Sequence, residues 1–153
     1  MADLVLYSQK LQTKLECFCE ICFAEMGFEF EHHGRHYDFL DVQKVYMQNG
    51  CFWCLMEDGR VIGTVAVRVI DAEKRISEMK RLYLLQEQQG KGYGKLMFDT
   101  AVAFARQQGF SSICADTRND RSAARHLMEK CGFCEIPRYN DNERAELFYG
   151  LEL

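Results

Sequence analysis

Gln89-Gly90-Lys91-Gly92-Tyr93-Gly94-Lys95 is the stretch of this 153-residue sequence that decides the fold. It follows a strand-like run, Ile76 to Leu84, and it opens an amphipathic helix expected over residues 93–108, which Gly109 ends. Glycines at such a junction let the backbone approach a ligand closely, and the first N–H groups of a helix have no carbonyl partners. These donors and the positive end of the helix dipole predict a phosphate site.

The spacing of the glycines separates three kinds of phosphate site. A P-loop requires Gly-x-x-x-x-Gly-Lys and then Ser or Thr, but Leu96 follows Gly94-Lys95 and Gln89 replaces the first glycine. The dinucleotide fingerprint Gly-x-Gly-x-x-Gly fails because its third glycine is missing in either count, although Asp116 after the next strand imitates the ribose-binding acid. An NAD-dependent oxidoreductase is therefore a distant alternative.

The rest of the sequence predicts a mixed α/β fold. Strands are expected at 4–7, 51–57, 60–70, 76–84, 111–115 and from 147 onward, and helices at about 11–26, within 38–48, at 93–108 and from 119 to 132. Asp58-Gly59 between two apolar runs indicates a hairpin, and Asn119 or Asp120 is expected to cap the last helix. The helix at 93–108 indicates that the strands on either side of it run parallel.

Composition and charge exclude several classes of protein. The chain has 48% hydrophobic residues and one proline, which is typical of a folded domain, and no linker divides residues 1–153. Nineteen Lys and Arg against 23 Asp and Glu argue against a nucleic-acid binder. No apolar run approaches the roughly 20 residues that span a bilayer, and the first residues do not resemble a signal peptide. We therefore expect a single cytoplasmic domain without a membrane partner.

The eight cysteines and the histidine-rich segment do not predict a metal site. In a reducing compartment the cysteines are expected to be thiols that pack as small apolar groups. Cys51 and Cys54 fall in a predicted strand, where residues three apart point to opposite faces, so they are poorly placed to share zinc. His32, His33 and His36 have no cysteine ligand nearby, and a solvated or substrate-facing loop is the simpler interpretation.

Gln89-x-x-Gly92-x-Gly94 resembles the pyrophosphate-binding signature of the GNAT superfamily of N-acetyltransferases, which use acetyl-coenzyme A. Residues 78–84 look like the fourth strand of that superfamily, and residues 119–133, ending in Gly-Phe, are similar to its last motif. With the hairpin at 57–63, the resemblance covers residues 50–153. It implies a GNAT-like fold, in which about four helices flank a central mixed, mostly antiparallel sheet with a splay between its two parallel central strands.

The resemblance also implies where acetyl-coenzyme A binds. The backbone of residues 82–84 is expected to pair with the pantetheine arm, the N–H groups of residues 90–95 to hold the pyrophosphate, and Asn119 to contact the arm. An N–H near Leu82 is expected to stabilise the carbonyl oxygen. The implied cofactor-binding residues are Leu82, Tyr83, Leu84, Gln89, Gly90, Lys91, Gly92, Tyr93, Gly94, Lys95 and Asn119.

An amine acceptor implies a base, because an alkylammonium of pKa about 10 must lose a proton before it attacks. Glu78 is the candidate, at a spacing before Gln89 similar to that of the glutamate base in some members, and a solvated or ion-paired strand residue is the equal alternative. Met128 stands where many members carry a tyrosine acid. Tyr139 and Tyr149 are candidate substitutes for that acid. The alternative is a buried structural tyrosine whose hydroxyl only finds a hydrogen-bond partner.

In this family the segments around residues 30–37 and 136–141 wall the acceptor pocket, which makes Arg35, His36 and Arg138 candidate substrate residues. The expected function is transfer of the acetyl group to a primary amine of a small molecule or amino acid, by a monomer or homodimer. A protein or peptide N-acetyltransferase remains open within the same class. The methionine at position 128 favours a further alternative, a non-catalytic acetyl-coenzyme A-binding regulatory module.

Overall fold

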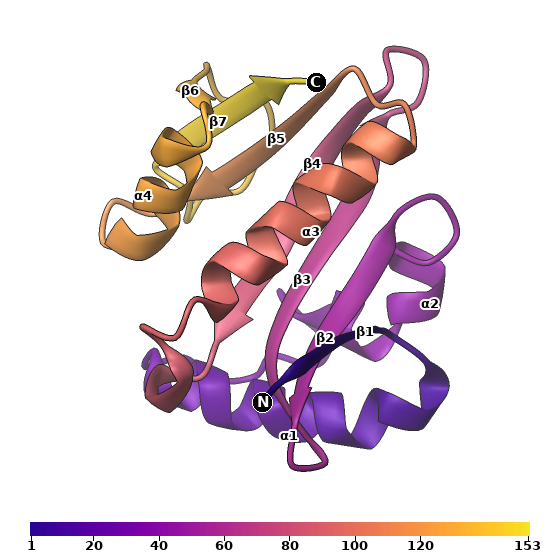
Figure 1. Cartoon of the computed structure of the whole chain (residues 1–153), viewed down its shortest axis with the longest axis vertical. Helices are drawn as coiled ribbons and strands as arrows, with labels where there is room; N and C mark the ends of the chain where they lie inside the picture. The colour runs from indigo at the N-terminus through magenta and orange to yellow at the C-terminus, as the bar shows by residue number, and fades with distance from the viewer.

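A seven-stranded sheet forms the centre of the computed structural model, which describes residues 1–153 (Figure 1). The strands are β1 (Asp3–Leu6), β2 (Cys51–Glu57), β3 (Arg60–Asp71), β4 (Ile76–Leu84), β5 (Ser112–Thr117), β6 (Cys134–Glu135) and β7 (Leu147–Glu152). Their order in the sheet is β1-β2-β3-β4-β5-β7-β6. Every neighbouring pair is antiparallel except β4 and β5, which are parallel, so the predicted mixed sheet is confirmed.

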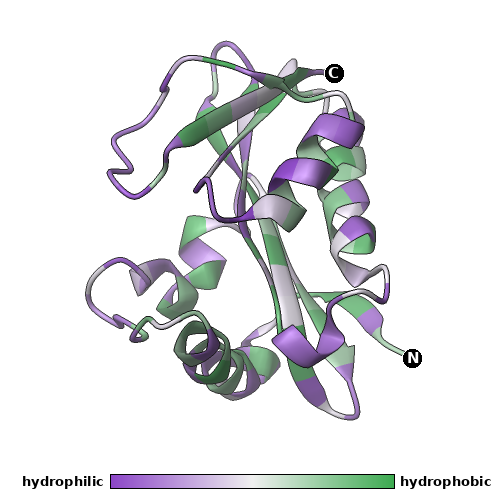
Figure 2. Cartoon of the chain, turned by 90° about the vertical axis from the view of Figure 1, so that its left-hand side faces the viewer, coloured by the Kyte–Doolittle hydropathy of each residue, from purple (hydrophilic) through white to green (hydrophobic).

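Four α-helices accompany the sheet. They are α1 (Gln12–Glu25), α2 (Val42–Val45), α3 (Tyr93–Gln107) and α4 (Ser122–Lys130), with short 3-10 helices η1 (Gln9–Leu11), η2 (Tyr37–Leu40) and η3 (Gln86–Gln88). With the sheet seen near its edge, α1 lies on one side and α3 on the other (Figure 2). The four flanking helices agree with the fold expected from the sequence. None of them is both long and apolar enough to cross a membrane.

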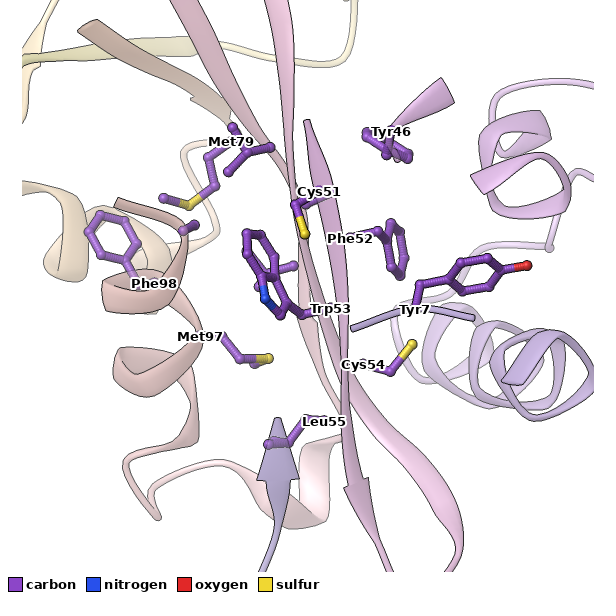
Figure 3. Packing of buried hydrophobic residues seen from close by; sticks show 14 of the residues in the cluster. Tyr7, Tyr46, Cys51, Phe52, Trp53, Cys54, Leu55, Met79, Met97 and Phe98 are labelled. Atoms are coloured by element: carbon purple, nitrogen blue, oxygen red, sulfur yellow. The ribbon is translucent and has the colours of Figure 1, made fainter. Parts of the chain in front are cut away.

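The core fills both faces of the central strands because alternate residues of β2 point to opposite sides (Figure 3). Phe52 faces α1 and contacts Tyr46, with 5.4 Å between ring centroids. Trp53 faces α3 and meets Phe104 edge to face at 5.3 Å. Cys54 is fully buried among these groups as a free thiol, as predicted, whereas Cys17 and Cys134 are exposed and do not pack in the core. Burial of each large apolar side chain contributes about 1.5–3 kcal/mol to folding.

The hairpin between β2 and β3 follows the sequence signal. Asp58 has φ 51° and Gly59 has φ 77°, which are the left-handed conformations that a two-residue type I′ turn requires. Glu57 and Arg60 face each other as the last pair of the ladder. The turn therefore sets the register of the two longest strands of the core.

The last helix begins later than predicted, and β6 was not predicted at all. Arg121 occupies the N-cap position of α4, and its side chain makes no capping hydrogen bond. Asn119 is not the cap because its side-chain amide donates to Glu146 Oε2 at 3.2 Å and its backbone N–H donates to Oε1 at 3.0 Å. β6 has only two residues, which is too short for an alternating pattern to indicate it.

The splay expected from the family resemblance is present. β4 and β5 pair only where Ile76 to Glu78 lie beside Ser112 to Cys114. Farther along β4 a bulge opposite β3 places Arg81 at φ 58°, and the Thr64 hydroxyl donates to the Arg81 carbonyl at 2.8 Å. The bulge twists the strand away from its former partner. One edge of β4 is thereby free of pairing with β5 beyond Glu78.

His36 is a core residue and not a substrate contact. Its ring is 1% exposed and stacks on Phe23, with centroids 4.1 Å apart and planes 9° from parallel. Its Nδ1 accepts a hydrogen bond from the Glu31 N–H at 2.9 Å. Burial, followed by the charges of Arg81 and Arg35, lowers the pKa of His36 to about 4. The ring is therefore neutral in the folded protein at ordinary pH.

This neutral histidine predicts an acid-sensitive fold. Below its ordinary pKa of 6.5 the unfolded chain binds a proton at His36, whereas the folded chain does not until about pH 4. The free energy of unfolding should therefore fall by about 2 kcal/mol between pH 7 and pH 5 from this ring alone. His36→Phe keeps a stacked ring that cannot be protonated, and its thermal midpoint should fall less steeply over the same pH range.

The exposed His33 supplies the matched control. His33→Phe should retain the pH dependence of the wild-type midpoint. Parallel midpoint curves for wild type and His36→Phe would contradict the prediction.

Candidate functional site

The glycine-rich loop before α3 presents a row of unused backbone donors. Gly90 has φ 79° and Gly92, the N-cap of α3, has φ 87°, a backbone conformation that favours glycine. No N–H from residue 90 to residue 95 donates a hydrogen bond within the protein, and the first that does belongs to Leu96. The start of α3 is therefore an anion site of six consecutive N–H groups reinforced by the helix dipole.

The two lysines of this loop have partners within the protein but remain exposed to solvent. Lys91 Nζ donates to Gln88 Oε1 at 3.0 Å, and Lys95 pairs with Asp99 one turn along α3. The Gln89 amide donates to the Leu84 carbonyl at 3.4 Å and ties the loop to the end of β4. Both lysines are exposed, so they can add positive charge around the N–H row.

Two adjoining cavities lie beside the splay between β4 and β5. We call the one of about 140 Å³ the inner cavity and the one of about 340 Å³ the outer cavity. Both are walled by the end of α1, by β4 and by α4, and the inner cavity also reaches residues 142–145. The residues common to both walls are Met26, Phe28, Tyr83, Arg118, Arg121 and Ala124. Because the two cavities share these walls, we refer to them together as the groove.

Four of the eleven predicted cofactor residues line this groove. Leu82 lines the inner cavity, Leu84 and Gln89 line the outer one, and Tyr83 lines both. Residues 90–95 and Asn119 line neither cavity, and the side-chain amide of Asn119 is hydrogen-bonded to Glu146. Met128, at the position where the resemblance led us to look for a tyrosine, is buried in the wall of the inner cavity.

The structure brings the two predicted catalytic residues together, away from the cavity walls. Glu78 is fully buried, and its Oε1 accepts from Arg68 Nε at 2.8 Å. Its Oε2 accepts from the Tyr139 hydroxyl at 2.6 Å and from Asn140 Nδ2 at 3.1 Å. Neither Glu78 nor Tyr139 lines either cavity. Glu78 is thus a paired, fully satisfied carboxylate.

The surroundings of Tyr139 keep its proton in place. Burial, and after it the negative charge of Glu78, raises the pKa of the Tyr139 phenol. Burial would lower the pKa of Arg68, but the adjacent Glu78 carboxylate outweighs burial and raises it. The phenol is therefore a weak acid that keeps its proton and donates a hydrogen bond to Glu78. The other candidate, Tyr149, is buried and donates to Glu129 at 3.2 Å.

Asp116 is the carboxylate that does line the groove, in the wall of the inner cavity. It accepts from Asn140 Nδ2 at 2.6 Å and from Asn142 Nδ2 at 3.3 Å. Because Asn140 also donates to Glu78, one amide links the buried carboxylate to the cavity wall. In the sequence Asp116 attracted attention only as an imitation of a ribose-binding acid. Its place at the end of a parallel strand was the available indication of a site.

A buried ion pair fixes the bulge of β4. Arg81 donates to both carboxylate oxygens of Asp38, at 2.8 and 2.9 Å, and Tyr46 donates to Asp38 Oδ2 at 2.5 Å. Burial would raise the pKa of Asp38, but the charge and hydrogen bonds of Arg81 outweigh burial and lower it. Arg81 also donates to the Arg35 carbonyl at 2.7 Å. The segment 35–38 is thereby attached to the splayed strand.

Of the three predicted substrate residues, only Arg35 lines the inner cavity. His36 is in the core, as described above. Arg138 donates to the carbonyls of Asn142 and Ala145 at 2.9 and 3.2 Å, so it braces the loop before β7. Sequence reasoning missed Arg118, Arg121 and Arg144, which line the same cavity. No group of three or more His, Cys, Asp or Glu side chains is arranged to hold a metal ion.

Comparison with known proteins supports the resemblance drawn from the motifs. The family model described as "Acetyltransferase (GNAT) family" matches residues 15–133. A probable N-acetyltransferase camello of Xenopus tropicalis is 36% identical over 115 residues, which are 70% of this chain and 52% of the relative. N-acetylaspartate synthetase of Xenopus tropicalis is 33% identical over 65% of this chain and 37% of the relative. The chain thus spans about half the length, or less, of these curated relatives.

Solved structures agree on the fold. A GNAT-family acetyltransferase of Staphylococcus aureus Mu50 superposes with a TM-score of 0.87 over 99% of both chains, at 18% identity. A phosphinothricin acetyltransferase of Sinorhizobium meliloti, solved in complex with AcCoA, gives 0.77 over 99% of this chain and 88% of the other, also at 18% identity. Together with the fit to residues 15–133, these findings show that the chain belongs to the GNAT family of acetyltransferases.

Proposed function

We propose that the protein is an N-acetyltransferase that transfers the acetyl group of acetyl-coenzyme A to a primary amine of a small molecule or amino acid. The observation that carries the proposal is the row of six unused N–H groups from residue 90 to residue 95 at the start of α3. A pyrophosphate is the ligand that such a row fits best, because it can accept several charge-assisted hydrogen bonds at once. Family membership and the named relatives support the same activity.

Each of the two cavities in the groove suits a different ligand. The outer cavity reaches Gln89, so it suits the pantetheine arm that continues from a pyrophosphate at the loop. The backbone of β4 beyond Glu78 has no partner strand on its β5 side and is available to pair with that arm. The inner cavity, which Asp116 lines, then suits the acceptor amine. When bound, acetyl-coenzyme A supplies an activated thioester carbonyl.

Gly94→Pro tests the N–H row directly. Position 94 lies in the first turn of α3, where proline is tolerated because its missing N–H has no intrahelical partner. Loss of this donor to a charged phosphate oxygen should weaken acetyl-coenzyme A binding by about 10-fold or more, as measured by calorimetry.

Gly94→Ala is the matched control. It keeps the N–H, and its Cβ would meet only Leu127 Cδ1, at an ordinary 3.6 Å. This variant should bind with an affinity close to that of the wild type. If wild-type protein binds no acetyl-coenzyme A, or if proline at position 94 leaves the affinity unchanged, the proposed cofactor site is wrong.

The chemistry requires a base that takes the proton of the acceptor ammonium group, directly or through water. The amine nitrogen forms a bond to the acetyl carbon as the C–S bond breaks, and the ammonium proton must be removed first. Of the two linked carboxylates, only Asp116 lines the inner cavity. We assign Asp116 the contact with the ammonium group and the uptake of its proton, and we assign Glu78 the positioning of Asn140, which donates to both carboxylates. This differs from the role of base first predicted for Glu78.

The leaving thiolate does not require Tyr139. A coenzyme A thiol of pKa about 8.5, by analogy with cysteine, leaves as a tolerable anion near neutral pH. The Tyr139 hydroxyl donates a hydrogen bond to Glu78 and lies outside both cavity walls. Release of the thiolate to water, without a tyrosine acid, is consistent with the methionine at position 128.

The two carboxylates give different pH–rate profiles when they are neutralised. Asp116→Asn should lower kcat/KM for the amine by 10-fold or more at pH 7 and recover toward pH 9–10, where the amine loses its proton unaided. Glu78→Gln should lower kcat at all pH values and lower the thermal midpoint, because it leaves Arg68 unpaired. A recovery at high pH in Glu78→Gln but not in Asp116→Asn would reverse the assignment.

A non-catalytic acetyl-coenzyme A-binding module is the second candidate, and the buried methionine at position 128 favours it. Release of free thiol from acetyl-coenzyme A, measured against a panel of small amines and amine-bearing peptides, separates the alternatives. Turnover with small amines supports the proposal. Binding without turnover of any amine would identify a binding module, and turnover of peptides alone would identify a peptide acetyltransferase.

A further inference from the structure

The inner cavity holds more positive charge than its walls neutralise. Six basic residues line it, against Asp116 as the only acidic one. Those six are Arg35, Lys80, Arg81, Arg118, Arg121 and Arg144. Arg81 is paired with Asp38, Arg118 is paired with Asp120, and Arg35 forms a longer ion pair with Glu31. Lys80, Arg121 and Arg144 form no ion pair with any carboxylate of the chain.

Three of these arginines surround a single aromatic ring. The guanidinium carbons of Arg35, Arg118 and Arg144 lie 5.8, 5.5 and 5.8 Å from the centroid of Phe28. Cation–π contact with one ring compensates only part of the repulsion among three like charges. Burial, and after it the charge of Arg144, lowers the pKa of Arg35, which reflects this crowding. An anion held between the guanidinium groups would relieve the repulsion.

Arg35 also carries an unused hydrogen-bond donor. Its Nη1 is buried and has no hydrogen-bond partner. Its ion-pair partner, Glu31 Oε2, lies 3.7 Å away, which is too far for a hydrogen bond. A buried donor without a partner costs free energy, so such a group is an indication of a ligand. The chain itself provides no other acceptor for this atom.

The cofactor does not account for this part of the charge. Arg118 and Arg121 also line the outer cavity, where they can meet the cofactor. Arg35, Lys80 and Arg144 line the inner cavity alone. At about 140 Å³ that cavity is well below the roughly 300–1,000 Å³ of sites for drug-sized ligands. Its occupant must therefore be both small and acidic.

We propose that Arg35 and Arg144, supported by Lys80, form a carboxylate-binding subsite that selects small amines carrying two acid groups, the class of the dicarboxylic amino acids. The proposal rests on the acetyltransferase function proposed above, and it names the acceptor class of the same site. Asp116 meets the ammonium group, and the guanidinium groups take the carboxylates as paired N–H···O bonds. A neutral acceptor leaves these donors unpaired, and such a loss produces strong discrimination between substrates.

Acid–amide pairs test the subsite because they differ in charge and hardly in size. With saturating acetyl-coenzyme A, kcat/KM should be at least 10-fold higher for glutamate than for glutamine, or for aspartate than for asparagine. Arg144→Gln and Arg35→Gln should each reduce this ratio by 10-fold or more, mainly through a higher KM for the acid. Arg144 is exposed and its guanidinium makes no hydrogen bond within the protein, so its replacement should leave the fold intact.

Arg106→Gln, in the last turn of α3 and outside both cavities, removes the same charge and should keep the wild-type ratio. Equal rates for acid and amide in the wild-type protein would overturn the proposal, as would a ratio that neither cavity variant changes. Turnover of acidic peptides in place of the free amino acids would overturn the small-molecule part of it.

A binding experiment without turnover separates this proposal from the proposed function. Glutarate should shift the NMR signals of the Arg35 and Arg144 side-chain Nε–H groups, whereas the neutral isostere glutaramide should not. Such shifts support the subsite even in a protein that fails to acetylate. If acetyl-coenzyme A binds and is turned over but glutarate moves neither signal, the acetyltransferase function stands and the acidic subsite does not.

Discussion

The divergence of β4 from β5 after Glu78 is the feature on which the rest of the site depends. Parallel neighbours in the middle of a sheet ordinarily continue their ladder, because an unpaired backbone group away from water is costly. Here the bulge at Arg81, with its φ of 58°, twists β4 aside. The bidentate pairing of Arg81 with the buried Asp38 fixes that conformation. Backbone strain of this kind persists only where the surroundings enforce it.

The same divergence explains why a polar network is buried at the last paired residues. Glu78 lies where the ladder ends, and its carboxylate is satisfied by Arg68, Tyr139 and Asn140. A buried carboxylate with fewer partners would be strongly destabilising. Because Asn140 continues the network to Asp116, the orientation of a cavity-lining carboxylate depends on a charge that no ligand touches. Networks of this kind specify geometry more than they add stability.

The sequence could predict those features that local patterns encode. The hairpin turn at Asp58-Gly59, the strand from Ile76 to Leu84 and the start of α3 at Tyr93 are set by residues adjacent in the chain, and all three agree with the structure. The cap of α4 was predicted wrongly because Glu146, 27 residues away, competes for Asn119. Side-chain partners so distant in sequence leave no periodic pattern.

The acceptor side of the site was the least predictable part, because its side chains also meet partners that are distant in the sequence. Arg35, Arg118 and Arg144 come from three separate segments and meet only because each folds against Phe28. Arg138 looked equivalent in the sequence, but two backbone carbonyls occupy its guanidinium group.

A chain that gathers like charges around one cavity loses stability by doing so, and evolution tolerates such a loss mainly where function requires it. The net charge of −4 shows that the positive excess is local. A local excess of positive charge that the fold does not neutralise indicates an anionic ligand. Any anion bound there stabilises the folded state.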